Sequence, residues 1–216
     1  MAEPVLTTHT PTTDVAFTPS VKVIQARRGS RQAYERVEAR GGWSSIVTPE
    51  LSKFIAERDS FYLATASAIG QPYIQHRGGP KGFLRVVDER TLGFADFRGN
   101  RQYITLGNLA ENDRAFIFLM DYAHQARVKI WGRALVVEND PALVERLMPA
   151  NYDAKPEQAV LFTIDAWDGN CRQHIPQLLA APDVAAAIDA FERKIAALEA
   201  ENRALRARLG EERAQA

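Results

Sequence analysis

The sequence has 216 residues, of which 46% are hydrophobic, so it is long enough to bury a core in one globular domain with appendages. Its 27 basic residues balance its 27 acidic residues, so no overall charge draws it to nucleic acid or to an anionic membrane. Its single cysteine, Cys171, excludes an intrachain disulfide and any site built from several thiolates.

The N-terminal segment, residues 1–20, is rich in threonine and proline, and we expect it to be a flexible arm. It lacks the basic start and apolar run of a secretory signal, and no stretch of the chain approaches the roughly 18 apolar residues of a membrane span. Together with the lone cysteine, these features favour a cytoplasmic location. A charged helix is predicted next, over residues 21–40, and Gly41 and Gly42 are expected to end it.

A second helix start is predicted at residues 48–50, where a threonine hydroxyl precedes a proline and a glutamate. After Asp59 the hydrophobic period changes to two residues. This alternation predicts a hairpin, with strands at 61–67 and 72–77 joined by a glycine-containing turn.

Further strands follow, interrupted only by short helical patterns at 101–110 and 141–147. The strands are expected at 83–87, 91–94, 115–120, 128–137 and 159–166. Because they are short and joined mainly by tight turns, they predict an antiparallel sheet closed as a barrel and not a parallel α/β sheet. The predicted fold class is therefore mainly β, with a barrel domain over residues 21–180.

A seven-residue repeat runs through residues 183–210. Its first core position holds Ile188, Ile195, Asn202 and Leu209, and its second holds Phe191, Leu198 and Leu205. β-branched residues at the first position, leucine at the second and a single asparagine favour a parallel, two-stranded coiled coil. The alternative is a single amphipathic helix packed on the barrel, because three heptads are close to the minimum for an independent coiled coil.

Signatures of metal sites, phosphate loops and serine nucleophiles are missing from the sequence, so any chemistry is expected to come from a cofactor. One polar patch is the strand end Gln75-His76-Arg77, which is followed by several glycines. Such a strand end suits a planar, hydrogen-bonding ring that lies close to the backbone. The alternative is a plain glycine loop with Arg77 in water.

A second patch covers residues 94–102, where a strand leads into a helical pattern. Asn100 is the expected N-cap, which would place Arg101 and Gln102 in the first helical turn. Free backbone N–H groups and the helix dipole favour an anion there, and a phosphate could bind between the amides and the guanidinium. The alternative is an arginine that simply points to water. A third polar patch, residues 167–174, is expected just after the last strand. Its side chains could line a ligand wall, and the alternative is a plain polar turn with one half-buried tryptophan.

In order along the chain, these patches resemble the pyridoxamine 5′-phosphate oxidase superfamily of FMN-binding split barrels. The resemblance spans about Leu51 to His174. It is carried by FYLATAS at 61–67, PYIQHRGGP at 72–80, FADFRGNRQYITLGNLAEN at 94–112 and AWDGNCRQHI at 166–175.

The resemblance implies an FMN phosphate held by a basic residue on the second strand, matched by Arg77, and by an Arg-Lys pair, matched by Arg101-Gln102. The chain departs from the family pattern at Gln102, where lysine is usual, and in its insertion at 78–82. That insertion leaves open which residue of the strand end contacts the ring. The candidate cofactor residues are Gln75, His76, Arg77, Phe94, Ala95, Asp96, Asn100, Arg101, Gln102, Trp167, Asn170, Arg172 and His174.

The resemblance also implies a homodimer with its flavin sites at the subunit interface, to which the third patch would contribute. The expected function is an FMN-dependent oxidoreductase that acts on a small substrate, with no nucleic-acid or membrane partner. The alternative is a non-catalytic protein that holds flavin, haem or a deazaflavin in the same barrel, with His76 or His174 as a haem ligand. No catalytic acid or base is identified.

Overall fold

The computed structural model describes residues 12–170 and 173–215, without the side chains of Asn170 and of the residues after Gly210. The chain divides into two compact units. The first is the barrel unit, Met1–Asp121 with Ala126–Gln173, and the second joins Tyr122–Gln125 to His174–Ala216. No helix in the described part of the chain is both long and apolar enough to cross a membrane.

Short helices precede the barrel: η1 (Thr12–Val15), α1 (Pro19–Arg28), α2 (Arg31–Glu38) and α3 (Pro49–Ala56). Residues 1–11 of the flexible arm predicted over 1–20 lie outside the described residues. The chain is ordered at 12–20, where Thr13 is fully buried and Thr12 Oγ1 donates to the carbonyl oxygen of Trp43 at 2.6 Å. The single helix expected over 21–40 is two helices. Gly29 ends the first of them in the left-handed conformation, with a φ of 81°.

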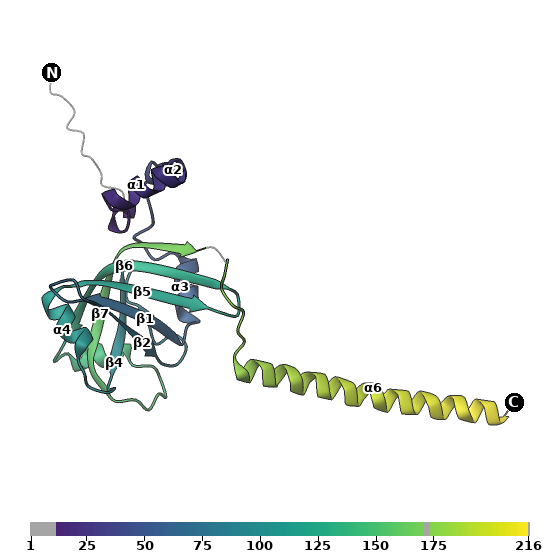
Figure 1. Cartoon of the computed structure of the whole chain (residues 1–216). Coiled ribbons are helices and arrows are strands. Elements are labelled where there is room, and N and C mark those ends of the chain that lie inside the picture. Colours follow the sequence, from purple (N-terminus) through teal and green to yellow (C-terminus); the bar gives the residue numbers. More distant parts are fainter. Residues whose placement is uncertain (1–11, 171–172, 216) are drawn as a thin grey trace, which may run out of the picture. The chain divides into compact units, whose positions relative to one another are not determined.

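Seven strands form one antiparallel sheet in the order β2-β1-β5-β6-β7-β4-β3, which confirms the mainly β fold class (Figure 1). The strands are β1 (Ser60–Ala66), β2 (Pro72–Gly78), β3 (Arg85–Val86), β4 (Thr91–Phe97), β5 (Arg114–Asp121), β6 (Ala126–Val137) and β7 (Pro156–Asn170). The sheet curls into a split barrel, so that β2 and β4 face each other without backbone pairing. The helices α4 (Ile104–Glu111) and α5 (Pro141–Leu147) complete the barrel unit, and α6 (Ala181–Gln215) belongs to the second unit.

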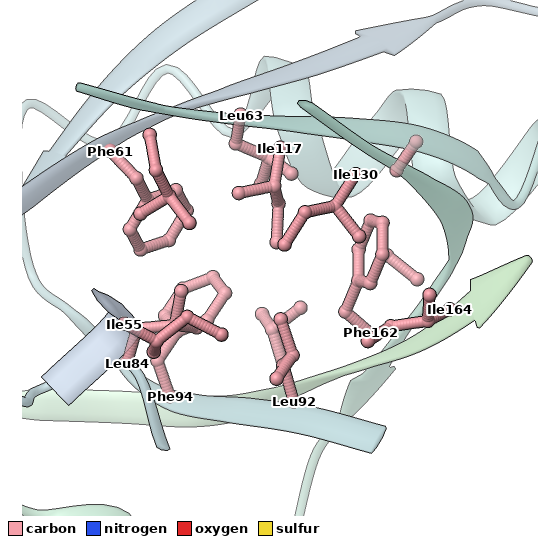
Figure 2. Packing of buried hydrophobic residues seen from close by; sticks show 14 of the residues in the cluster. Ile55, Phe61, Leu63, Leu84, Leu92, Phe94, Ile117, Ile130, Phe162 and Ile164 are labelled. Carbon is pink, nitrogen blue, oxygen red and sulfur yellow. The ribbon is translucent and has the colours of Figure 1, made fainter. Parts of the chain in front are cut away.

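The barrel interior is filled by apolar side chains from the inward faces of the strands. Figure 2 shows Phe61 and Ile117 pointing toward Leu92 and Phe94 from the opposite side of the interior. Helix α3 adds Ile55 to this core. Each fully buried side chain of this size stabilises the fold by roughly 1.5–3 kcal/mol, so the core is the main source of stability.

Three of the other differences between the predicted elements and the structure bear on the site. The strand expected at 83–87 shrinks to the two residues of β3, because Phe83 and Leu84 turn into the core. The helix expected at 101–110 begins only at Ile104. The last strand, expected to end at 166, continues to Asn170, so Trp167 lies within β7 and not after it.

Candidate functional site

The end of β2 presents two polar side chains toward the inside of the barrel. Gln75 and Arg77 alternate with outward-facing residues, and they lie opposite the buried Leu63 and Phe61 of β1. The Gln75 carboxamide oxygen accepts a hydrogen bond of 2.8 Å from the hydroxyl of Thr105 on α4. The amide of Gln75 is therefore held in a fixed orientation at the edge of the barrel.

His76 occupies the opposite face of the same strand. Its ring is exposed and makes an edge contact with the ring of Tyr62, with centroids 5.6 Å apart. The sequence left open which of Gln75, His76 and Arg77 contacts the ring. The structure places Gln75 and Arg77 on the inner face of β2 and His76 on its outer face.

Arg77 is held by a network that crosses from β2 to β4 and β7. Its guanidinium forms an ion pair with Asp96, which is only 5% exposed. The second carboxylate oxygen of Asp96 accepts a hydrogen bond of 2.7 Å from Gln158. The guanidinium carbon also lies 5.8 Å from the centre of the Phe94 ring, within the range of a cation–π contact. No acceptor among the described residues reaches the buried Arg77 Nε.

The loop from Arg98 to Tyr103 has a backbone that excludes the predicted helical cap. Arg101 and Tyr103 both have positive φ, 62° and 56°, which helical residues do not adopt. Asn100 is therefore not the N-cap. Its side-chain oxygen instead accepts from the backbone N–H of Gln102 at 3.2 Å, within the loop. The predicted place of Arg101 and Gln102 in a first helical turn is wrong for the same reason.

Helix α4 begins at Ile104, and its N-cap residue Tyr103 makes no side-chain capping bond. The N–H groups of a first helical turn have no partner within the helix, so an uncapped start can bind an anion. Residues other than glycine seldom adopt the left-handed backbone conformation, and those that do cluster at functional sites. The loop is thus shaped to present backbone donors beside α4.

Arg101 has a different electrostatic surrounding from Arg77. Its Nε donates a hydrogen bond of 2.9 Å to the hydroxyl of Tyr103, which raises the pKa of the guanidinium. The Tyr103 hydroxyl lies 3.5 Å from a carboxylate oxygen of Glu157. Among the described residues, no carboxylate lies within ion-pair distance of Arg101 itself. Arg101 is therefore exposed and has no direct ion pair, although Glu157 lies near enough to raise its pKa further.

These elements surround a hollow of about 390 Å³ between β2, β4 and the loop. We call it the β2–β4 hollow. Its walls are Tyr73, Gln75, Arg77, Asp96, Phe97, Gly99, Asn100, Arg101, Gln102, Tyr103, Ile104, Thr105, Leu106 and Glu157. A second hollow of about 460 Å³ shares Gln75, Arg77 and Asp96 with the first and extends it past Phe94 and Ala95. The two hollows form one site whose walls carry the guanidiniums of Arg77 and Arg101 together with the carboxylates of Asp96 and Glu157.

Two of the predicted site residues serve mainly as packing. The Phe94 side chain belongs to the main core, and Ala95 belongs to a smaller cluster with Leu143 and Leu147 of α5. Both are at most 2% exposed, so they border the second hollow without presenting a polar group to it.

The third sequence patch lies elsewhere in the molecule. Trp167 follows Gln158 on β7 by nine residues, which separates them by about 30 Å along the strand. The Trp167 indole N–H donates to the carbonyl oxygen of Ile46 at 2.8 Å and not toward the β2–β4 hollow. Asn170 pairs with Arg127 at the end of β7, Arg172 lies outside the described residues, and His174 belongs to the second unit. Within the barrel unit of one chain, Trp167 and Asn170 therefore lie far along β7 from the hollow that contains Arg77 and Arg101.

Sequence reasoning missed several residues of the site. Tyr73 shares the inner face of β2 with Gln75, and the two-residue alternation could have identified it. Glu157 and Gln158 join the site because β7 pairs with β4, placing Gln158 opposite Asp96. That pairing spans a long separation in sequence, so local patterns carry no signal for it. No cluster of metal-binding side chains occurs in the described part of the chain.

Comparison with known proteins identifies one family. Residues 47–171, more than half of the chain, match the family model described as pyridoxamine 5′-phosphate oxidase. No curated protein matches the sequence.

Several solved structures match this chain with TM-scores below 0.5. HupZ of Group A Streptococcus has 16% identity and a TM-score of 0.47, with 62% of this chain and 99% of that chain covered. An FMN-binding protein from Syntrophomonas wolfei has 14% identity and a TM-score of 0.44, with 72% and 99% covered. A protein from Clostridium acetobutylicum related to general stress protein 26 has 14% identity and a TM-score of 0.44, with 62% and 94% covered.

Proposed function

Because the chain belongs to the pyridoxamine 5′-phosphate oxidase family, we propose that it is a flavoprotein that binds FMN in the β2–β4 hollow. The charge distribution around the hollow carries this proposal. Asp96 compensates Arg77, whereas no described carboxylate pairs with Arg101. An exposed arginine beside an uncapped helix start favours a phosphate, which the guanidinium and the backbone amides can bind together.

The residues of the hollow fit both parts of FMN. Arg101 and the start of α4 would hold the phosphate, with Gln102 and Asn100 shaping the loop between them. Gln75 and Arg77 would donate hydrogen bonds to the flavin ring. The position of Arg77 on the walls of both hollows supports this assignment, because its guanidinium can donate to a ring oxygen.

When bound, FMN supplies transfer of a hydride or of two electrons. The residues of this chain bind and orient it. The edge of the barrel also excludes water from one side of the site, because Phe83 and Phe94 are buried beneath the second hollow. We assign the chain to the FMN-dependent oxidoreductases that act on a small substrate, and we place it in the reducing cytoplasm.

We further propose that two copies form a homodimer and share each flavin site. Trp167, Asn170, Arg172 and His174 of the second copy would then complete a site formed by Arg77 and Arg101 of the first. Two observations support this arrangement. Trp167 lies about 30 Å along β7 from Gln158 beside the hollow of its own barrel, and the outward face of β2 leaves Ile74 61% exposed. A symmetric dimer buries such a face on both copies at once.

The absorption spectrum of the purified protein tests the proposal. Added FMN should give the two broad near-ultraviolet and blue bands of a bound, oxidised flavin, shifted from those of free FMN. Bleaching by NADH or NADPH, followed by recovery in air, would support the oxidoreductase. A protein whose flavin bands resist both donors would instead be a flavin-binding protein without this activity.

A second candidate function is a binding protein that holds haem on the same barrel. The exposed His76 ring, which makes an edge contact with the ring of Tyr62, is the observation that favours it. A single intense Soret band after addition of haemin, abolished in His76→Ala, would support this function over the first.

A further inference from the structure

Helix α6 has an apolar face that the second unit leaves uncovered. The helix runs for 35 residues, from Ala181 to Gln215. Its seam is the set of side chains at the two core positions of the heptad: Val184, Ile188, Phe191, Ile195, Leu198, Asn202, Leu205 and Leu209. The apolar members of the seam are between 39% and 69% exposed.

Helix α3 of the barrel unit, by contrast, covers its apolar face. The side chains of Leu51 and Ile55 on this shorter helix are at most 2% exposed. Helices gain most of their stability from packing an apolar face, so a long helix with an open seam requires a partner. From Val184 to Leu209 the seam extends about 38 Å, which is long enough for a coiled coil.

We propose that α6 pairs in parallel and in register with α6 of a second copy of this chain. Two charge pairs favour this occupant. In a parallel pair, Lys194 of one helix meets Glu199 of the partner subunit, and Glu201 meets Arg206 of the partner subunit, on both sides of the seam. Both contacts join opposite charges, and each occurs twice in a symmetric pair, once on either side of the seam.

Asn202 selects the parallel arrangement. In parallel pairing it faces its own copy, and the two carboxamides can hydrogen-bond across the seam. An antiparallel pair would instead place Asn202 against an apolar side chain such as Phe191 or Leu198, and leave a buried amide without a partner. The seam ends at Leu209, next to Gly210, and a glycine destabilises the interior of a helix because its backbone is more flexible.

This interaction is separate from the flavin site. It uses side chains of α6 alone and assigns to the second unit a role in joining two copies. A failure of the coiled coil would leave the residues of the β2–β4 hollow unchanged, and a failure of FMN binding would leave the seam of α6 unchanged.

Single-cysteine crosslinking of the full-length chain tests the pairing. In a Cys171→Ser background, Ile188→Cys and Leu209→Cys each place one thiol in the seam, about 32 Å apart along the helix. A parallel, in-register pair brings each thiol next to its own copy, so both variants should form a disulfide-linked dimer under mild oxidation. Arg193→Cys, on the outer face, is the matched control and should remain mostly uncrosslinked.

A charge exchange tests the register. In the Ile188→Cys chain, Lys194→Glu opposes two carboxylates and should slow crosslinking by roughly two- to ten-fold. Adding Glu199→Lys restores opposite charges and should restore the rate. An antiparallel pair would crosslink neither seam variant with itself. That result would overturn the proposal, as would crosslinking no faster than in Arg193→Cys, which is expected of a helix packed on its own barrel.

Discussion

Arg77 on β2 and Asp96 on β4 form an ion pair between two strands that share no backbone hydrogen bond. β2 ends the sheet on one side, and β4 is followed only by the two-residue β3 on the other. The pair therefore joins the two sides of the split in the barrel. Both side chains also form part of the wall of the β2–β4 hollow. The same pair therefore holds the two sides of the barrel together and shapes the candidate site.

Removing the charge of Asp96 should destabilise the barrel. Asp96→Asn leaves Arg77 as a largely buried cation without its carboxylate, and we expect the free energy of unfolding to fall by about 2–4 kcal/mol. Asp113→Asn is the matched control, because its ion pair with Arg133 is about half exposed and contributes roughly 0–1 kcal/mol. Urea denaturation of both variants measures the difference, and equal losses would show that the Arg77 pair does not close the barrel.

Arg101 should discriminate FMN from riboflavin, which lacks the phosphate. Arg101→Ala removes a charge-assisted hydrogen bond worth roughly 1.5–3 kcal/mol, so FMN affinity should fall ten-fold or more while riboflavin affinity changes little. Arg98→Ala is the control on the same loop, because Arg98 lies 3.8 Å from Glu157 and its charge is already compensated. Titrations followed by flavin fluorescence give all the affinities. Parallel losses for the two ligands in Arg101→Ala would place the phosphate elsewhere.

The sequence predicted the fold where local patterns decide it. The two-residue alternation located the hairpin of β1 and β2, and the Thr48 cap is confirmed by its bond from the Leu51 N–H at 3.2 Å. It failed in the loop before α4, because nothing local signals that Arg101 and Tyr103 adopt left-handed backbone conformations.

The candidate site was predictable only in part, for a related reason. Arg77 and Arg101 belong to local polar patches, and the structure places both around one hollow. Their different charge surroundings come from Asp96, Gln158 and Glu157, which reach the site through strand pairing across the sheet. Such pairings depend on the whole barrel, so a single sequence does not reveal them.

Gly132 should tolerate no side chain. It lies on β6 at a shift in the register with β7, and a Cβ there would come within 2.1 Å of the Thr163 carbonyl oxygen. Gly132→Ala should therefore lower the free energy of unfolding by about 1–3 kcal/mol. In Gly107→Ala, on α4, the Cβ meets no described atom within 4 Å, and the variant should be stabilised by about 0.5–1 kcal/mol. Thermal unfolding followed by circular dichroism compares them, and a Gly132→Ala protein as stable as the parent would contradict the described packing.

Asn202 should limit the oligomeric state. Asn202→Ile makes the seam of α6 uniformly apolar, so it should tighten association while weakening the preference for two strands over three or four. Light scattering during a dilution series measures both effects, and Ala200→Ile, outside the seam, is the control. Identical behaviour of the two variants would indicate that Asn202 does not lie between paired helices.

Direct titration of the purified, full-length chain with FMN and with riboflavin tests the central claim, that the β2–β4 hollow binds a flavin through its phosphate. We predict saturable binding of one FMN per chain, at least ten-fold tighter than that of riboflavin, with the difference lost in Arg101→Ala. Absence of saturable FMN binding, or equal affinity for the two flavins in the unmodified chain, would contradict the account.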